Sequence, residues 1–325
     1  MNVRARTGIG LIVALTVTAL SLTRTDAQQR ATVAIDPDDI GGVVTSAKGP
    51  EAGVWVVAET SDLPTKFARI VVTDDQGRYV VPDLPKATYD LFVRGYGLVD
   101  SPKVKSTPGQ HLDLKAVVAP DARAAAQVYP AGWWFSMMEL PQGAKEQEDF
   151  QKTMRGCMDC HHLGDKATRE IEPALAKMSS STLDAWERRV KFGPSSSGMS
   201  ADFMRLGEGR KKFAEWTDRI AKGEVPKTAP PRPTGVERNL VLTLWDWGSP
   251  LDGRADNVAS DRRNARVNPN GLVFGASQMT DALNVLDPKT NKVSITPGHH
   301  PCDFSESWVL SHVFVSIQPT IPGLP

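Results

Sequence analysis

The chain has 325 residues, of which 40% are hydrophobic and 23% charged, a composition typical of globular protein and not of a disordered chain. Lys+Arg and Asp+Glu both number 38, so the formal net charge is zero. No net field draws such a chain to nucleic acid or to an anionic membrane, and we expect no nucleic-acid partner.

The N-terminus has the pattern of a secretory signal peptide over residues 1–27. Arg4 and Arg6 precede an apolar run over 8–22, and Ala27 ends a small-residue cleavage site. A membrane anchor needs about 20 apolar residues, and this run is shorter and rich in threonine. We therefore expect an exported protein, periplasmic or extracellular, without a transmembrane segment in the mature chain.

Residues 38–118 alternate apolar and polar side chains in short runs, which predicts an all-β domain. Turn residues stand between the runs, as in Asp-Asp-Gln-Gly at 74–77 and Pro-Asp-Leu-Pro at 82–85. About seven strands in ~80 residues suit a small sandwich. The clearest strands are predicted at 54–58, 68–73, 78–81 and 89–93.

Short motifs mark this segment: Gly41-Gly42-Val43-Val44, Gly53-Val54-Trp55-Val56, Asp74-Asp75-Gln76-Gly77-Arg78-Tyr79, Leu84-Pro85 and Tyr89-Asp90-Leu91. With these motifs, about a quarter of the chain resembles the carboxypeptidase regulatory-like domain, a transthyretin-type, immunoglobulin-like sandwich. The resemblance implies a spacer or interaction module. Carbohydrate binding or adhesion by this sandwich is the alternative.

Residues 119–142 are predicted to form a connector that is rich in alanine and then in aromatic residues. Five large apolar side chains stand close together there: Trp133, Trp134, Phe135, Met137 and Met138. We expect this cluster to pack against a neighbouring domain. A solvent-exposed platform for a ligand is the alternative.

Residues 143–224 have helical periodicity and predict an all-α domain. A first helix is expected over 143–157 and a second over 181–190, where a serine begins a capping-box pattern. A third is expected over 201–222, which a glycine and a proline follow. The three helices would surround a turn that carries two cysteines.

That turn reads Cys157-Met158-Asp159-Cys160-His161, the C-x-x-C-H attachment signature of c-type haem. Two thiols three positions apart reach the two vinyl groups on one edge of the porphyrin, and the next residue offers its imidazole to the iron. The spacing therefore predicts one covalent haem c, held by Cys157 and Cys160, with His161 as the proximal ligand.

Two other interpretations of the cysteine pair stay open. A redox disulfide is one, although such pairs stand at a helix N-terminus after a strand, whereas here the helical pattern precedes Cys157. A zinc site is the other, with His161 and His162 beside the two cysteines. Four ligands within six residues cannot easily surround one tetrahedral ion.

A methionine from a loop on the opposite face is the usual sixth ligand of such a haem, because a thioether favours ferrous iron. Met199 is our candidate, since Gly193 to Met199 read as a flexible loop between two helices. Met204 and Met178 are the alternatives, together with a histidine or an open site. His162 is expected at the surface or near a haem propionate.

The order of helix, C-x-x-C-H, helix, methionine loop and helix resembles the class I cytochrome c fold over 143–224. A proline-rich linker is predicted over 225–236. Beyond it, the segment from Glu237-Arg238-Asn239 through Trp245-Asp246-Trp247-Gly248 resembles, to about residue 296, the start of a propeller akin to streptogramin lyase. Such propellers form the C-terminal half of long exported bacterial proteins.

Residues 237–325 are too short for a closed propeller, which needs at least four blades of about 40 residues. Strands are expected at 239–245 and 271–275, and a strand, turn and strand over 283–293. The segment 297–325 lacks this periodicity and carries His299, His300 and Cys302. We interpret it as a truncated or altered reading frame, with a weak metal cluster as the alternative.

The sequence thus predicts a multidomain α+β protein: an N-terminal sandwich, a class I cytochrome c domain and a partial propeller-like segment. We expect an exported mono-haem cytochrome that passes single electrons to a redox partner protein. The alternatives are a truncated haem-containing propeller enzyme, lyase-like or dehydrogenase-like, and a carbohydrate-binding or adhesion scaffold. The sequence has no Ser/His/Asp arrangement, phosphate-binding glycine loop or dinucleotide fingerprint, so no catalytic residue is assigned.

Overall fold

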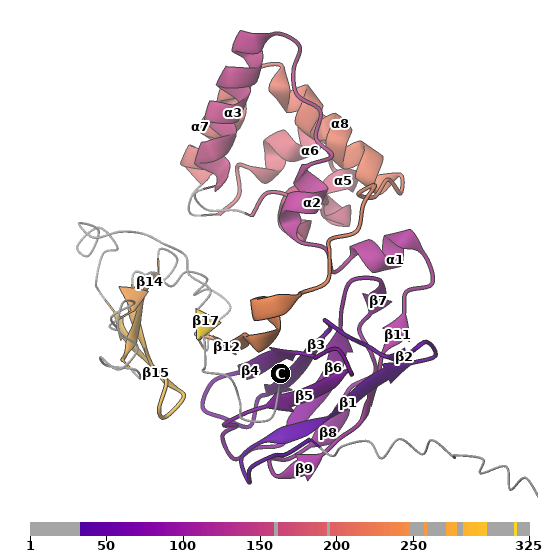
Figure 1. Ribbon diagram of the computed structural model, residues 1–325. Coiled ribbons are helices and arrows are strands. Elements are labelled where there is room, and N and C mark those ends of the chain that lie inside the picture. The colour runs from indigo at the N-terminus through magenta and orange to yellow at the C-terminus, as the bar shows by residue number, and fades with distance from the viewer. Residues whose placement is uncertain are drawn as a thin grey trace, which may run out of the picture. The chain divides into compact units, whose positions relative to one another are not determined.

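The structure, a computed structural model, describes residues 33–158, 162–193, 196–247, 257–258, 271–277, 282–297 and 315–316. The predicted signal peptide and the His299, His300 and Cys302 cluster lie outside these residues. The chain is a mixed α and β protein with a β-rich N-terminal region (Figure 1). Within the described ranges, no helix is both long and apolar enough to cross a bilayer.

Two sheets make up the N-terminal region. In the first, β1 pairs antiparallel with β2 and β5 and parallel with β9 and β10. Its strands are β1 (Ile40–Ser46), β2 (Gly49–Pro50), β5 (Arg78–Val81), β9 (Gln110–His111) and β10 (Leu114–Lys115). The second sheet has the order β17-β12-β4-β3-β6-β8. Its strands are β3 (Trp55–Thr60), β4 (Phe67–Val72), β6 (Tyr89–Arg94), β8 (Val104–Ser106), β12 (Val241–Trp245) and β17 (Val315–Ser316). A short pair, β7 (Leu98–Val99) and β11 (Val117–Val118), runs antiparallel.

Side chains from both sheets meet in one apolar core. Val44 of β1, Val56 of β3 and Leu91 of β6 are fully buried in it. Successive side chains of a strand point to opposite faces, which is why the alternating pattern of the sequence buries one face of each sheet. The hydroxyl of Tyr79 donates to the Leu112 carbonyl at 2.6 Å, so this buried phenol is satisfied. The predicted β-rich segment is therefore present as two sheets around a shared core.

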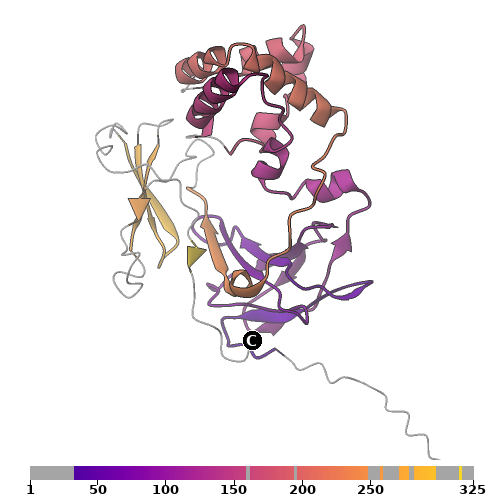
Figure 2. The ribbon, with the colours of Figure 1, turned by 45° about the horizontal axis from the view of Figure 1, so that its top comes forward.

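The strand predicted at 239–245 is present as β12, but it joins the N-terminal region. It pairs antiparallel with β4, where Leu242 lies opposite Ile70 and Trp245 opposite Phe67. The rings of Phe67 and Trp245 pack edge to face, with centroids 5.9 Å apart. In Figure 2 the orange β12 lies along the edge of the purple strands. β4 offers unpaired backbone groups there, and β12 satisfies them. The strand thus extends the second sheet and not the propeller-like segment of 237–325.

Helices follow the first eleven strands. They are α1 (Ala122–Ala126), α2 (Ala131–Phe135), α3 (Ala144–Met158), α4 (Lys166–Arg169), α5 (Pro173–Lys177), α6 (Thr182–Arg189), α7 (Ser196–Arg205) and α8 (Gly209–Ala221). The predicted first and second helices are confirmed as α3 and α6. Ser181 caps α6, since its hydroxyl accepts from the backbone N–H of Asp184 at 3.1 Å.

The predicted third helix, 201–222, is wrong as one continuous helix, because α7 ends at Arg205 and α8 begins at Gly209. Gly207 between them has a φ of 54°, a left-handed conformation that breaks the helix. A Cβ on Gly209 would come within 2.5 Å of the Phe150 ring, so the start of α8 packs directly on α3.

The helices have a core of their own, which includes the fully buried Trp216 together with Phe213, Phe150 and Met154. Trp134 belongs to it too, and its backbone carbonyl accepts from Trp216 Nε1 at 2.9 Å. Phe135, Met137 and Met138 pack against this core, whereas Trp133 does not belong to it. The helical core therefore includes most of the predicted connector cluster and begins before residue 143. In both views α3 lies beside α7 (Figures 1 and 2).

The proline-rich segment predicted as a linker over 225–236 has no helix or strand up to residue 234, and a 3₁₀ helix η1 (Gly235–Asn239) begins within it. Hydrogen bonds and an ion pair attach this segment to loops of the β-rich N-terminal region. Arg232 forms an ion pair with Glu51 at 2.6 Å and donates to the Tyr96 carbonyl at 3.1 Å.

A separate antiparallel sheet, in the order β13-β14-β15-β16, is formed by β13 (Asn257–Val258), β14 (Val273–Ser277), β15 (Ala282–Asp287) and β16 (Lys292–Pro297). The predicted hairpin within 283–293 is present. Asp287 holds its turn by accepting from Lys289 N at 2.9 Å and from the Thr290 hydroxyl at 2.8 Å.

Candidate functional site: the Cys157 cavity

The first cysteine of the C-x-x-C-H motif lies in the last turn of α3, where the sequence predicted it. Its half-buried side chain lines a cavity of about 180 Å³, here called the Cys157 cavity. The lining comes from α3, the turn that follows the motif, α4, α6, α7 and α8. Most of it is apolar, including Met154, Leu163, Trp186, Phe203 and Phe213.

Met199 lines the same cavity as Cys157. It comes from α7 and not from a loop, because the serine run at 195–197, which indicated a loop, leads into a helix that begins at Ser196. Serine is well tolerated at helix starts. Met204 and Met178 do not line the cavity, and 56% and 68% of their surfaces are exposed. The structure thus brings one of the three candidate methionines to the motif.

Cys160 and His161 lie outside the described residues, so the second thioether bond and the proximal ligand stay predictions. His162 is exposed, which agrees with the surface position expected for it. Among the residues that the structure describes, no group of three or more His, Cys, Asp or Glu side chains could hold a metal ion. The zinc interpretation depends on residues outside that set and remains open.

Gly164 and Arg169 fix the turn after the motif. Gly164 has a φ of 99°, and a Cβ there would lie 2.0 Å from the Ala131 carbonyl oxygen. Its N–H donates to the Thr168 hydroxyl at 2.8 Å, and its carbonyl accepts from Arg169 Nη1 at 2.6 Å. Only glycine fits this position, since it combines a left-handed backbone with a close approach to α2.

Arg169 is a buried cation that the sequence did not single out, with 4% of its surface exposed. Its guanidinium stacks on the Trp134 ring, 4.2 Å from the centroid, and its Nη2 lies 3.4 Å from Glu170. Burial lowers the pKa of Arg169 from its ordinary value, and attraction to Glu170 and Asp165 opposes that shift. The arginine joins the turn after the motif to α2, because a cation over an aromatic face is stabilised electrostatically.

The aromatic wall of the Cys157 cavity directs its polar atoms away from the cavity. Trp186 Nε1 donates to the Thr217 hydroxyl at 3.0 Å. Trp186 and Phe203 each pack edge to face on Phe213, with centroid distances of 5.0 and 5.7 Å. Because the indole N–H is satisfied elsewhere, the cavity presents ring surface and sulfur, which suits an apolar, planar ligand.

One cationic side chain, that of Arg189, also lines the cavity. The adjacent Arg188 pairs with Asp184 at 2.9 Å, but no ion pair to Arg189 occurs among the described residues. Asp202, the acid that lines the cavity, pairs with Arg205. The sequence contained a signal for this difference. Arg188 lies four residues after Asp184, a spacing that favours an ion pair on a helix, whereas Arg189 does not have that spacing from Asp184. Arg189 is therefore positioned to receive a carboxylate from a ligand.

A haem agrees with these residues in chemical type. Two sulfur-bearing side chains from separate helices, a ring-lined wall and one cation are the groups that a covalently held porphyrin dicarboxylate would contact. The cavity is smaller than the roughly 300–1,000 Å³ of small-molecule sites. A Cβ on Gly156 of α3 would lie 3.3 Å from the Asp202 carboxylate of α7, so these helices are close together. We expect α3 and α7 to lie further apart when a haem is bound.

No family model matches the sequence, and no curated protein matches it either.

Proposed function

We propose that the protein is an exported c-type cytochrome that binds one haem covalently and passes single electrons to a redox partner protein. The observation that supports this most directly is the meeting of Cys157 and Met199 at one apolar cavity. Cys157 and Met199 come from separate helices, and a haem attached to the first and ligated by the second would need both at one cavity.

The roles follow from the residues. Cys157 and Cys160 would hold the haem covalently, and His161 and Met199 would offer their side chains to its iron. When bound, the haem supplies a one-electron iron couple. The walls of Trp186, Phe203 and Phe213 exclude water, and a dry site with a thioether ligand favours the reduced iron. Arg189 offers its guanidinium to a propionate at the cavity.

The proposal also covers the domain types. In it, the helices of 143–224 form a class I cytochrome c domain, with the aromatic segment before them as part of its core. The two N-terminal sheets form a carboxypeptidase regulatory-like sandwich. The sheet β13 to β16 corresponds to a single blade-like unit of the propeller-like segment.

The experiment is a pyridine haemochrome spectrum of protein exported from cells equipped for cytochrome c maturation, after acid-acetone extraction removes non-covalent haem. We expect a c-type band in the wild type and none in the Cys157→Ala, Cys160→Ala double variant. Cys302→Ala is the matched control, since it removes the third cysteine of the chain and leaves the motif intact. A colourless wild-type protein, or a band that survives in the double variant, would refute the proposal.

A further inference from the structure

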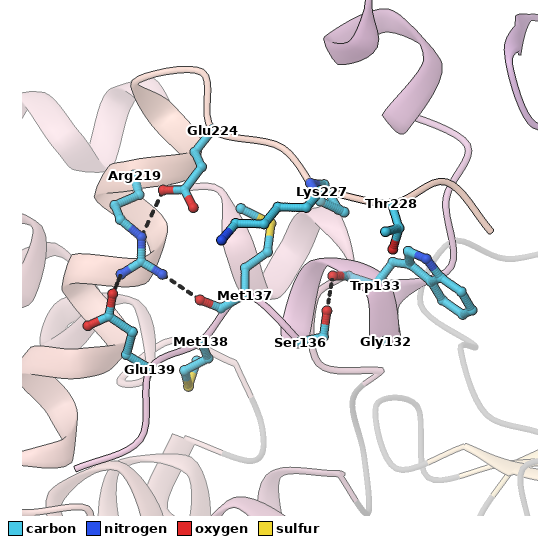
Figure 3. A pocket seen from close by; sticks show the side chains of 11 residues that line it. Gly132, Trp133, Ser136, Met137, Met138, Glu139, Arg219, Glu224, Lys227 and Thr228 are labelled. Atoms are coloured by element: carbon cyan, nitrogen blue, oxygen red, sulfur yellow. Dashed lines mark hydrogen bonds and ion pairs between the residues drawn. The ribbon is translucent and has the colours of Figure 1, made fainter. Parts of the chain in front are cut away.

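A second and larger hollow lies on the helical part, with a volume of about 750 Å³ (Figure 3). It shares no lining residue with the Cys157 cavity. One side is α2 and the loop after it, over 132–139, and the other is the end of α8 with residues 224–228. We call it the Trp133 groove. Its volume is in the range of sites that bind small molecules.

Arg219 joins the two sides of the groove. Its guanidinium pairs with Glu224 at 2.8 Å and with Glu139 at 3.2 Å, and it donates to the Met137 carbonyl (Figure 3). Deeper in the core, the hydrogen bond from Trp216 Nε1 to the Trp134 carbonyl also ties α8 to α2. The groove is therefore built before any ligand arrives, which lowers the entropy cost of binding.

Trp133 stands at one end of the groove with its indole partly exposed. Trp134, Trp186 and Trp216 each donate their indole N–H to a protein acceptor. Trp133 Nε1 has no such acceptor among the residues that the structure describes. The Trp133 ring thus offers the groove a flat apolar face, and its N–H is a hydrogen-bond donor that no described residue uses. Aromatic rings of this kind bind ligands that have one apolar face.

The charged side chains of the groove balance each other. Arg219 and Lys227 are cationic, and Glu139 and Glu224 are anionic. Lys227 reaches into the groove between Met137 and Glu224, and no carboxylate among the described residues pairs with it (Figure 3). The two glutamates would repel an anionic ligand, and Arg219 and Lys227 would repel a cationic one. The lining therefore favours a neutral ligand whose groups both donate and accept hydrogen bonds.

We propose that the Trp133 groove binds a neutral oligosaccharide. One sugar ring packs its apolar face on the Trp133 indole. Its hydroxyls accept from the Lys227 ammonium and donate to the Glu224 carboxylate, while the Met137 and Met138 side chains contact C–H groups. The groove is open, so a chain of sugar units can continue beyond it. This inference does not rest on the proposed haem, because no residue of the Cys157 cavity takes part.

The test is isothermal titration of the full-length protein with hexasaccharides of four neutral types: β-linked glucose, α-linked glucose, β-linked xylose and N-acetylglucosamine. We expect at least one to bind, and Trp133→Ala to weaken that binding about tenfold or more. Lys227→Gln should weaken it several-fold. Phe192→Ala is the matched control, because Phe192 is an aromatic residue with 59% of its surface exposed and does not line the groove.

Three results would overturn the inference. The first is that none of the four probes binds at millimolar concentration. The second is equal binding by the wild type and Trp133→Ala, or, if that variant fails to fold, by the wild type and Lys227→Gln. The third is tighter binding of a polygalacturonate fragment, since the groove would then select an acidic sugar and not a neutral one.

Discussion

Cys157 on α3 and Met199 on α7 are residues of separate helices that line one apolar cavity. Met204 lies on the same helix as Met199 but is largely exposed, and its sulfur accepts from Arg210 Nη1 at 3.1 Å. The two methionines therefore form a natural pair for identifying the distal ligand of the proposed haem.

We expect Met199→Ala to remove the near-infrared charge-transfer band that a methionine gives with ferric haem, and to lower the midpoint potential, because a thioether stabilises ferrous iron. Met204→Ala should keep both properties. Absorption spectra and redox titration of the two purified variants decide this. Loss of the band in Met204→Ala alone would assign the distal position to Met204.

Gly164 gives a prediction on stability. Gly164→Ala combines a positive φ with a Cβ at 2.0 Å from a backbone oxygen, so we expect it to lower the free energy of unfolding by at least about 2 kcal/mol. Gly132→Ala is the control, since a Cβ there meets nothing within 4 Å. Urea unfolding followed by circular dichroism compares the two. Equal stability of both variants would contradict the role given to Gly164.

The motif of the site was predictable from the sequence, because Cys157, Cys160 and His161 stand within five residues. The walls of the cavity were not predictable. Trp186, Phe203 and Phe213 come from three helices, and their meeting depends on the tertiary packing of α6, α7 and α8. Nor does local spacing reveal a cation–π contact between Arg169 and Trp134, which lie far apart in the chain.

At the scale of elements, the extended segment after α8 is anchored by Arg232 to Glu51. Burial raises the pKa of Glu51, but hydrogen bonds from Ser46 and Arg232 and attraction to Arg232 and Lys48 outweigh it, so the pKa is lower than usual. A carboxyl group whose pKa is lower in the folded state stabilises the fold above its unfolded pKa of about 4.3. That stabilisation is lost as the pH falls through the folded pKa.

We therefore expect Glu51→Gln to cost about 1–3 kcal/mol of unfolding free energy at pH 7. The difference from the wild type should shrink as the pH falls below about 4, because the wild-type carboxyl is then protonated as well. Urea unfolding at a series of pH values measures this. Glu148→Gln, at an exposed acid for which no ion pair occurs in the described part of the chain, should show a much smaller effect. A difference for Glu51→Gln that does not change with pH would exclude the ion pair as its cause.

Secondary structure with a local signal was predictable, and its long-range partners were not. The cap at Ser181 and the turn at Asp287 to Asn291 depend on neighbouring residues, and both are present. The break between α7 and α8 was missed because isolated glycines such as Gly207 and Gly209 are tolerated in many helices. Here the packing of Gly209 on Phe150 favours a new helix start. The partner of β12 was missed because β4 lies far away in the sequence.

At the scale of the whole molecule, the helices of 122–221 lie in sequence between strands that belong to the N-terminal sheets. β11 precedes them, and β12 follows them and returns to β4. In the order of the chain, the helical part is therefore an insertion into the β-rich region and not a domain that follows it.

Two truncations test this arrangement. A chain ending at residue 236 lacks β12, whereas one ending at residue 247 keeps it. We expect the shorter chain to melt at a lower temperature, because it lacks the backbone pairing of β12 with β4 and the packing of Trp245 on Phe67. Thermal unfolding by circular dichroism compares the two. Identical behaviour would show that β12 contributes nothing to the sheet in solution.

The pairing of β12 with β4 also closes a loop, and the whole helical part lies inside it. When the helical part is folded, the loop has a short effective length. When it is unfolded, the loop is a long flexible chain. Each doubling of effective loop length adds about 0.6 kcal/mol to the entropic cost of closing the loop. Any ligand that stabilises the helices therefore also stabilises β12 through chain entropy, without touching it. The amide hydrogens of Leu242 and Leu244 should exchange more slowly once the proposed haem is attached, so that the edge of the sheet would report on the maturation of the insert.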